Sequence, residues 1–302
     1  MSIFADLIRA GIVREGVNIG SMTTYRVGGS AKYFVEINSH EMAAEVIPLA
    51  QQSGLPLLMV GNGSNLLVAD GEHEVIALHV SGELAELTTE IDGESVRVFA
   101  GAGMDLPIAA RRLGSEGITG FEWAVGVPGT FGGAVVMNAG GHGSDMAASV
   151  VSAGIWREGQ YSSWDKSALG FGYRHSSVQP TDVVTDVVLE LRVGSSEESK
   201  ERLSEIVRWR REHQPGGQNA GSVFRNPEGG SAGELIERAG LKGERIGGAV
   251  VSTKHANFIQ VEDGGSAADV AALIQLIHDR VLADSGNALQ SENRFFGFGL
   301  SR

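Results

Sequence analysis

Cysteine is absent from this chain of 302 residues, which excludes disulfide bonds, thiolate catalysis and cysteine-ligated zinc sites. The sequence also lacks any run of about 18 uncharged apolar residues, so it predicts no membrane-spanning helix. Runs rich in Lys or Arg are missing too, and a net charge of −13 repels phosphate backbones at long range. The eight histidines show no HxxxH spacing. These absences disfavour nucleic-acid-binding proteins, membrane proteins and metalloenzymes.

Glycine is the residue in excess, with 43 copies that follow no collagen-like period. The glycines gather at a few places, which indicates loops where the backbone approaches a ligand or takes positive φ. The opening segment, MSIFADLIRAG, has apolar residues at helical spacing and lacks the basic start of a signal peptide. With no cysteine and no leader, the chain is expected to be cytoplasmic.

Length and element order predict an α+β protein with two or three domains. The polar stretch GSSEES precedes a long helix ending near His213, and we place a linker there. The predicted parts are an N-terminal subdomain at 1–68 that is completed by 290–302, a second subdomain at 69–195, and a C-terminal domain at 200–289.

Several elements have clear local signals. The N-terminal region has the pattern of a strand, a helix at 41–52 and a second strand, and Pro48 is expected to shorten or kink that helix. Near the C-terminus, Ser266 and Asp269 have the spacing of a capping box. They predict a helix over 267–284, where apolar residues recur at helical spacing.

The first candidate ligand site directly follows the apolar strand LPLLMV. It consists of Gly61, Asn62, Gly63, Ser64 and Asn65. A strand that ends in small residues exposes several backbone N–H groups at one point, which suits phosphate oxygens. The alternative interpretation is a tight hairpin turn, and the segment alone does not decide between them.

A second glycine-rich segment lies in the middle of the chain. Its candidate ligand-binding residues are Gly126, Val127, Pro128, Gly129, Thr130, Gly132, Gly133 and Asn138. Gly129 and Thr130 are expected to open a short helix whose N–H groups face an anion. Gly132 and Gly133 remove side chains where a flat ligand or another backbone comes close. A tightly packed helix crossing is the alternative interpretation.

Both segments resemble the FAD-binding domain of the UDP-N-acetylenolpyruvoylglucosamine reductases, the MurB family. The resemblance continues in order through nearly the whole chain. Further matching motifs are FGYR (171–174), AGSVFRNP (220–227), KHANF (254–258) and ENR (292–294). The shortness of the segment after Arg174 resembles the shorter, type II form of the family.

The resemblance implies a fold of the vanillyl-alcohol-oxidase/PCMH type with non-covalent FAD. It implies that NADPH is the co-substrate and that UDP-N-acetylglucosamine enolpyruvate is reduced to UDP-N-acetylmuramate. This reaction belongs to peptidoglycan synthesis, and through it to cell-wall biogenesis, cell shape and cell division. The protein is expected to act as a monomer.

Catalytic roles follow by matching positions in those motifs. Ser222 matches the family's proton donor, Arg174 the arginine on the substrate carboxylate, and Glu292 the third catalytic residue. A guanidinium can hold the enolate charge that hydride addition creates, and a well-placed hydroxyl can protonate the carbanion. Glu292 orients Ser222 or a bridging water, or acts on the enolate, and the sequence does not choose.

The predicted substrate contacts are Tyr173, Asn226, Lys254 and His255. Asn226 is expected to share a strand with Ser222, and a purely structural histidine is the alternative interpretation of His255.

Two positions depart from the family pattern. His142 stands where tyrosine is frequent, and Asn293 stands where valine usually follows the terminal glutamate. Neither change removes a catalytic group.

Two other functions are compatible with the sequence. One is another flavin oxidase or dehydrogenase of the same fold, in which His142 could tether the flavin. The other is a binder that kept only the cofactor loops. The presence of Arg174, Ser222 and Glu292 together argues against the second.

Overall fold

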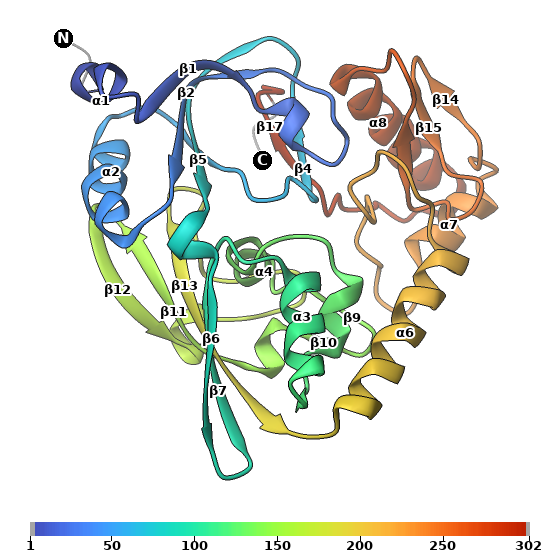
Figure 1. Cartoon of the computed structure of the whole chain (residues 1–302). Helices are drawn as coiled ribbons and strands as arrows, with labels where there is room; N and C mark the ends of the chain where they lie inside the picture. The colour runs from blue at the N-terminus through green and yellow to red at the C-terminus, as the bar shows by residue number, and fades with distance from the viewer. Residues whose placement is uncertain (1–3, 300–302) are drawn as a thin grey trace. The chain divides into compact units, whose positions relative to one another are not determined.

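The computed structural model describes residues 4–299, and these residues form two compact units (Figure 1). Unit 1 comprises the residues up to Gly16, Lys32–Gly61 and Glu74–Arg210. Unit 2 comprises Val17–Ala31, Asn62–His73 and the residues from Arg211 on. The division into three parts stays a prediction, and residues 300–302 of its last segment lie outside the described residues.

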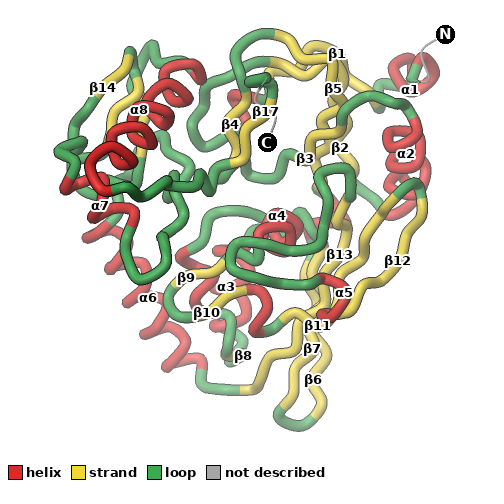
Figure 2. The backbone as a smooth tube through the Cα atoms, turned by 180° about the vertical axis from the view of Figure 1, so that it is seen from behind, coloured by secondary structure: helices red, strands yellow, loops and turns green. Residues whose placement is uncertain are grey.

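Two sheets form the framework of unit 1 (Figure 2). The first has the strand order β1-β2-β5-β3, with β3 parallel to β5. The second is antiparallel with the order β12-β11-β13-β7-β6, and β8 pairs with β13. The strands of these sheets, together with the β9–β10 hairpin, are β1 (Val13–Asn18), β2 (Ser30–Ile37), β3 (Leu57–Met59), β5 (Glu72–Val80), β6 (Leu87–Asp92), β7 (Ser95–Gly101), β8 (Ile118–Thr119), β9 (Gly140–Gly141), β10 (Ser144–Asp145), β11 (Val150–Arg157), β12 (Gln160–Asp165) and β13 (Val183–Val193).

The helices of unit 1 include the one predicted around Pro48. This helix, α2, runs through Pro48 to Gln52, so the expected shortening is wrong, and Ser39 caps its start by accepting from the N–H of Met42. The strands on either side of α2 are not neighbours, because β5 lies between them and β3 in the sheet order. The helices are α1 (Ala5–Arg9), α2 (His40–Gln52), η2 (Gly82–Ala85), α3 (Leu106–Ser115), η3 (Glu122–Gly126), α4 (Phe131–Met137), η4 (Met146–Ala148), α5 (Lys166–Leu169) and α6 (Ser196–His213), whose last turn enters unit 2.

One continuous hydrophobic cluster fills unit 1. At its centre Phe121 and Phe131 stack with ring centroids 5.4 Å apart, and both rings are buried. Burying one such ring stabilises the fold by about 2–3 kcal/mol. Phe131 is the first residue of α4, so this packing fixes the start of the helix in the second glycine-rich segment.

Unit 2 has its own hydrophobic cluster, which includes Tyr25 and Leu67 from its N-terminal segments. Its strands β14, β15 and β16 form an antiparallel sheet, while β17 pairs in parallel with β4 (Figure 1). The elements are η1 (Gly20–Met22), β4 (Leu66–Val68), α7 (Ala232–Arg238), β14 (Arg245–Ile246), β15 (Ala249–Val251), β16 (Ile259–Val261), α8 (Ala267–Ser285) and β17 (Arg294–Phe296).

The sequence predicted α8 almost to the residue. Ser266 accepts from the N–H of Asp269, whose side chain accepts from the N–H of Ser266, so the capping box is complete. Gly286 ends the helix in the left-handed conformation with φ of +73°.

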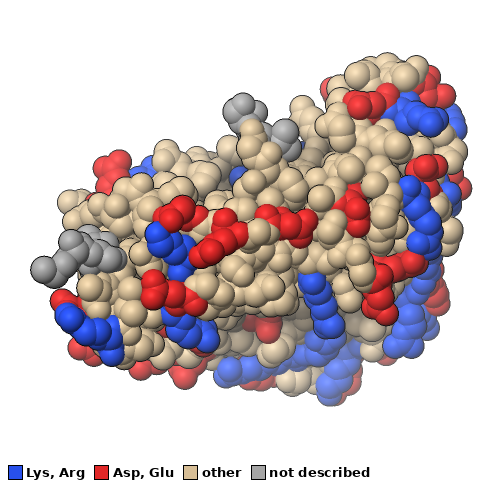
Figure 3. All heavy atoms as spheres, turned by 90° about the horizontal axis from the view of Figure 1, so that it is seen from above, with Lys and Arg blue, Asp and Glu red and all other residues tan. Residues whose placement is uncertain are grey.

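The surface carries charges of both signs, and Figure 3 shows acidic and basic side chains interspersed over the face that it presents. Over residues 4–299 we find no helix with the length and apolarity needed to cross a bilayer.

Candidate active site

The first glycine-rich segment, residues 61–65, connects β3 to β4. It is not a hairpin turn, because β3 pairs with β5 and β4 pairs with β17. Gly63 has φ of +58°, and a Cβ added there would lie 2.5 Å from the Cα of Thr23. The Gly63 carbonyl accepts from the N–H of Thr24 at 3.3 Å. The loop is therefore held in a conformation that only glycine fits.

The second glycine-rich segment begins α4 at its N-cap, Thr130. The N–H of Phe131 donates to the carbonyl of Met104 at 3.0 Å, and the N–H of Gly132 donates to that of Ala102 at 2.8 Å. Two N–H groups of the first turn thus bind the protein itself, which differs from the expectation that they face an anion. The loop from β7 to α3 packs against α4 and supplies these carbonyls.

Gly132 and Gly133 have different roles. A Cβ on Gly132 would lie 3.1 Å from the Cβ of Ala102, so this glycine allows two segments of protein to pack. Gly133 is exposed, and a Cβ there would have only the Thr130 hydroxyl oxygen within 4 Å, at 3.8 Å. A Cβ on Gly61 would lie 2.8 Å from that same oxygen. Gly61 and Thr130 therefore bring the two glycine-rich segments together in unit 1.

Asn138 ends α4 in the left-handed conformation and is buried. Its Nδ2 donates to Asp145 Oδ2 at 3.2 Å and to the carbonyl of Gly172 at 2.9 Å, and its Oδ1 accepts from the N–H of Ala147 at 2.9 Å. The amide thus ties the β9–β10 hairpin to the segment before Arg174. A contact between Asn138 and a cofactor stays a prediction.

Arg174 adopts the left-handed conformation with φ of +54°, which costs a side-chain-bearing residue about 1–2 kcal/mol. Its guanidinium donates to the carbonyl of Gly140 at 2.9 Å and lies 5.4 Å from the ring centre of Tyr173. Tyr173 is 60% exposed. The backbone strain and the two contacts present a half-buried guanidinium beside the β9–β10 hairpin.

Ser222 lies in an irregular segment, so the strand that it was expected to share with Asn226 is wrong. The side chain of Asn257 replaces a neighbouring strand. Its Oδ1 accepts from the N–H of Phe224 at 2.9 Å, and its Nδ2 donates to the carbonyl of Phe224 at 2.8 Å. The N–H of Val223 donates to the Asn257 carbonyl at 2.9 Å. These bonds fix the backbone directly after Ser222.

Glu292 lies beside this segment in unit 2, although it is far from Ser222 in sequence. The N–H of Glu292 donates to the carbonyl of Val223 at 2.7 Å. The carbonyl of Glu292 accepts from Asn65 Nδ2 at 3.0 Å. Unit 2 therefore brings together the proposed proton donor, the terminal glutamate and the end of the first glycine-rich segment.

Asn226 and Lys254 both have partners within unit 2. Asn226 Oδ1 accepts from the N–H of Ala232 at 3.0 Å, at the start of α7. Lys254 Nζ donates to the carbonyl of Arg211. Both side chains are exposed, and their contacts with a substrate stay predictions.

His255 is held by its neighbours. Its Nδ1 accepts from the N–H of Asn257 at 3.2 Å, and its ring contacts Phe258 edge to face with centroids 4.9 Å apart. Burial lowers the pKa of His255, which favours the neutral ring that this acceptor role requires. These contacts are compatible with the structural interpretation, and a contact between His255 and the substrate stays a prediction.

Comparisons with known proteins identify the family. A model of the UDP-N-acetylenolpyruvoylglucosamine reductase C-terminal domain matches residues 213–296, and an FAD binding domain model matches residues 31–157. UDP-N-acetylenolpyruvoylglucosamine reductase 2 of Symbiobacterium thermophilum is 38% identical, over 98% of each chain. The chain belongs to the UDP-N-acetylenolpyruvoylglucosamine reductase family.

Two further relatives agree with this assignment. The UDP-N-acetylenolpyruvoylglucosamine reductase of a Synechococcus species is 40% identical, over 95% of this chain and 94% of its own. The crystal structure of the Thermus caldophilus reductase superposes with a TM-score of 0.81 at 34% identity, covering 94% of this chain and 99% of that one. The predicted α+β fold with an FAD-binding domain is confirmed, and this reductase is an FAD-dependent oxidoreductase.

The residues of the reductase fit FAD. Gly61 and Gly133 both face the Thr130 hydroxyl without a side chain of their own, and a Cβ on Gly61 would collide with it. The absence of side chains at these two positions lets the backbone of both glycine-rich segments come close to the Thr130 hydroxyl, a donor of the kind that pyrophosphate oxygens accept from.

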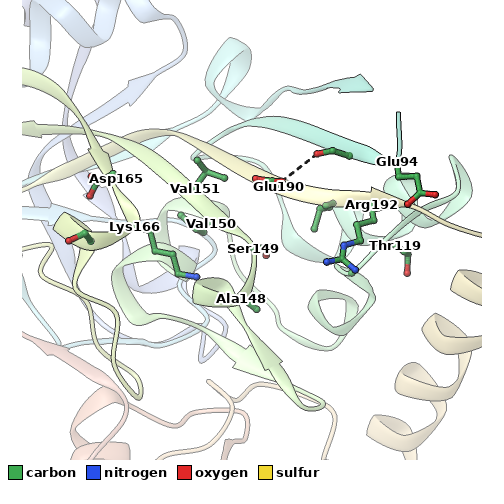
Figure 4. Close-up of a pocket in the computed structure, with 14 residues that line it drawn as sticks. Glu94, Thr119, Ala148, Ser149, Val150, Val151, Asp165, Lys166, Glu190 and Arg192 are labelled. Carbon is green, nitrogen blue, oxygen red and sulfur yellow. Dashed lines mark hydrogen bonds between the residues drawn. The ribbon is translucent and has the colours of Figure 1, made fainter. Parts of the chain in front are cut away.

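A separate open cavity of about 1140 Å³ lies in unit 1 over β11 and β13 (Figure 4). Charges of both signs line it, including Lys166, Glu190 and Arg192. None of the residues predicted to bind FAD or substrate lines it.

Sequence reasoning missed three residues that shape the site of the reductase. Asn257 lies inside the KHANF motif, so its position there was an available signal. Asn293 was noted only as a departure from the family pattern. Tyr25 is fully buried and donates to Asn293 Oδ1 at 3.2 Å, and no local pattern points to this contact.

Proposed function

We propose that the reductase converts UDP-N-acetylglucosamine enolpyruvate to UDP-N-acetylmuramate with electrons from NADPH, as a step of peptidoglycan precursor synthesis. The observation that carries this proposal is the bond from the Glu292 N–H to the Val223 carbonyl, at 2.7 Å. It brings the backbone of Glu292 against the residue that follows Ser222, in the same unit as the loop ending at Asn65.

FAD would be held by the two glycine-rich segments, residues 61–65 and residues 126–133 together with Asn138. When bound, FAD would supply the hydride that reduces the enolpyruvyl double bond. The chain's own residues must then hold the charge that develops and deliver a proton.

Arg174 is assigned to the substrate carboxylate. Addition of hydride to the methylene carbon moves the electron pair of the double bond onto the carbon that bears the carboxylate, as an enolate. A planar guanidinium can bind both carboxylate oxygens and stabilise this charge. Its bond to the Gly140 carbonyl at 2.9 Å holds it in place before substrate binds.

Ser222 is assigned as the proton donor. Its hydroxyl proton passes to the carbanion, which completes the saturated product, and the serine oxygen then needs a proton from its surroundings. Glu292 is assigned to orient Ser222 or a bridging water, or to act on the enolate. The bonds from Asn257 keep the backbone after Ser222 rigid, as proton transfer with fixed geometry requires.

The sugar nucleotide is assigned to Tyr173, Asn226, Lys254 and His255. Tyr173 offers an exposed ring, and Lys254 offers a charge for phosphate. We also propose that the protein is a monomer of the shorter type II form and acts in the cytoplasm, where nucleotide-linked precursors and NADPH occur together.

The test separates the two halves of the reaction in the Ser222→Ala variant. Stopped-flow absorbance records bleaching of the flavin by NADPH, then recovery of its colour on adding the enolpyruvyl substrate. We expect the first rate within about twofold of wild type and the second slower by at least about 100-fold. Equal losses in both halves would refute the role of Ser222.

A further inference from the structure

A buried chain of hydrogen bonds runs through unit 2 and is centred on the side chain of Asn293. Asn293 and Tyr25 are both fully buried. The Tyr25 hydroxyl donates to Asn293 Oδ1 at 3.2 Å. Asn293 Nδ2 donates to Asn65 Oδ1 at 2.9 Å and to the carbonyl of Ala220 at 3.4 Å. One amide thus contacts three separate segments.

These contacts fix the orientation of the Asn293 amide. Burial raises the pKa of Tyr25 far above its usual value, so the hydroxyl remains a donor at any pH at which the protein works. Because the Ala220 carbonyl can only accept, Nδ2 must face it and Oδ1 must face Tyr25.

Two of these segments, together with the one that carries Asn293 itself, are those to which the proposed function assigns FAD binding and proton transfer. Asn65 ends the first glycine-rich segment, Ala220 precedes Ser222 by two residues, and Asn293 directly follows Glu292. Backbone bonds close the same network, because the N–H of Arg294 donates to the Asn65 carbonyl at 2.8 Å. A shift of Asn293 is therefore expected to move both the first glycine-rich segment, which is assigned to FAD, and the segment that carries Ser222.

We propose that Asn293, oriented by Tyr25, is a positioning residue that couples the cofactor loop to Ser222 and Glu292. This inference rests on the proposed function for the roles of those two residues. A valine at this position could neither donate to Asn65 and Ala220 nor accept from Tyr25.

The test compares Asn293→Val with a matched control, Ser266→Ala. The control removes the capping hydroxyl of α8 in the same unit and touches none of the three segments. FAD affinity is measured by titrating the FAD-free protein, and hydrogen exchange of the Glu292 and Arg294 amides is followed in that same FAD-free state. Steady-state kinetics at saturating FAD give kcat and KM separately.

For Asn293→Val we expect FAD binding about tenfold weaker and exchange of both amides at least about tenfold faster. We expect kcat about tenfold lower and KM for the enolpyruvyl substrate within about twofold, because the substrate carboxylate and nucleotide are assigned to other residues. Ser266→Ala should lower the Tm and leave FAD affinity, both exchange rates and kcat at wild-type values.

Tyr25→Phe removes a single oxygen and keeps the donors of Asn293. It therefore tests the same hydrogen-bond network if Asn293→Val folds poorly. We expect it to change FAD affinity and kcat in the same direction, each by about threefold. The inference is overturned if either network variant lowers the Tm as Ser266→Ala does while FAD affinity, amide exchange and kcat stay at wild-type values. Failure of the wild-type protein to reduce the enolpyruvyl substrate would refute the proposed function instead, and FAD affinity and amide exchange would still report on the coupling.

Discussion

At the scale of single residues, Arg174 is held in a strained backbone conformation and presents a planar cation. Arg174→Lys keeps the charge but loses the two-pronged contact with a carboxylate. We expect kcat/KM for the enolpyruvyl substrate to fall by about 100-fold or more. Steady-state kinetics measure this loss, and an FAD affinity equal to wild type is the control. A fall in kcat/KM of less than about threefold would contradict the assignment of Arg174 to the substrate carboxylate.

Within the first glycine-rich segment, Gly63 is the residue at which a substitution should disturb the backbone most. Gly63→Ala places a Cβ 2.5 Å from the Cα of Thr23 in addition to the cost of positive φ. Gly264→Ala is the matched control, because Gly264 has φ of +82° with nothing within 4 Å. We expect the control to cost about 1 kcal/mol of unfolding free energy and to bind FAD normally. Gly63→Ala should cost more and weaken FAD binding at least about tenfold, and equal effects would contradict this.

At the scale of elements, Glu122 joins η3 to α6. Its carboxylate is buried and accepts from the hydroxyl of Ser199 at 2.6 Å, the hydroxyl of Thr119 at 2.8 Å and the N–H of Gly120 at 2.9 Å. Burial by itself raises the pKa of Glu122, but these hydrogen bonds outweigh burial and lower it. Because the pKa of Glu122 is lower in the folded state than in the unfolded state, its carboxylate stabilises the fold at pH values above the pKa of the unfolded state. This stabilisation is lost as the pH falls through the pKa of the folded state.

We therefore expect Glu122→Gln to lower the unfolding free energy at pH 7 by about 2 kcal/mol. The difference from wild type should shrink as the pH falls below the ordinary glutamate value of about 4.5, because the wild-type carboxylate then gains a proton. Urea unfolding at several pH values measures both effects. A difference that stays constant down to low pH would show that charge plays no part.

Elements with local signals could be predicted from the sequence. The capping box of Ser266 and Asp269 and the glycine after α8 gave correct helix ends, because those interactions span only a few residues. The segment around Ser222 could not be predicted, since the side chain of Asn257 takes the place of a strand there. Pro48 was misleading, since α2 continues through it.

The sequence named candidate site residues but could not predict the contacts between their segments. The resemblance named Ser222 and Glu292, yet the backbone bond that joins their segments runs between Val223 and Glu292, which are far apart in sequence. The contact between Tyr25 and Asn293 has the same character, because it exists only after unit 2 has assembled from separate pieces.

At the scale of the whole molecule, unit 2 depends on two short segments of the N-terminal region. Tyr25 and Leu67 are fully buried in its hydrophobic cluster. We expect the isolated fragment 211–302 to lack native packing, because it would leave the partners of both side chains exposed. Near-ultraviolet circular dichroism and urea unfolding test this, with the full chain as the control. A cooperative unfolding transition of the fragment would contradict it.

The parallel pairing of β17 with β4 has a consequence for synthesis on the ribosome. β4 is synthesised early, and β17 is synthesised after every other described element. The edge of β4 that pairs with β17 is therefore unpaired while most of the chain is translated. A nonsense mutation just before Asn293 would retain every buried member of both hydrophobic clusters, yet it would leave that edge permanently open. Such a truncated product would be nearly complete in mass, unable to finish its cofactor loop, and prone to aggregate.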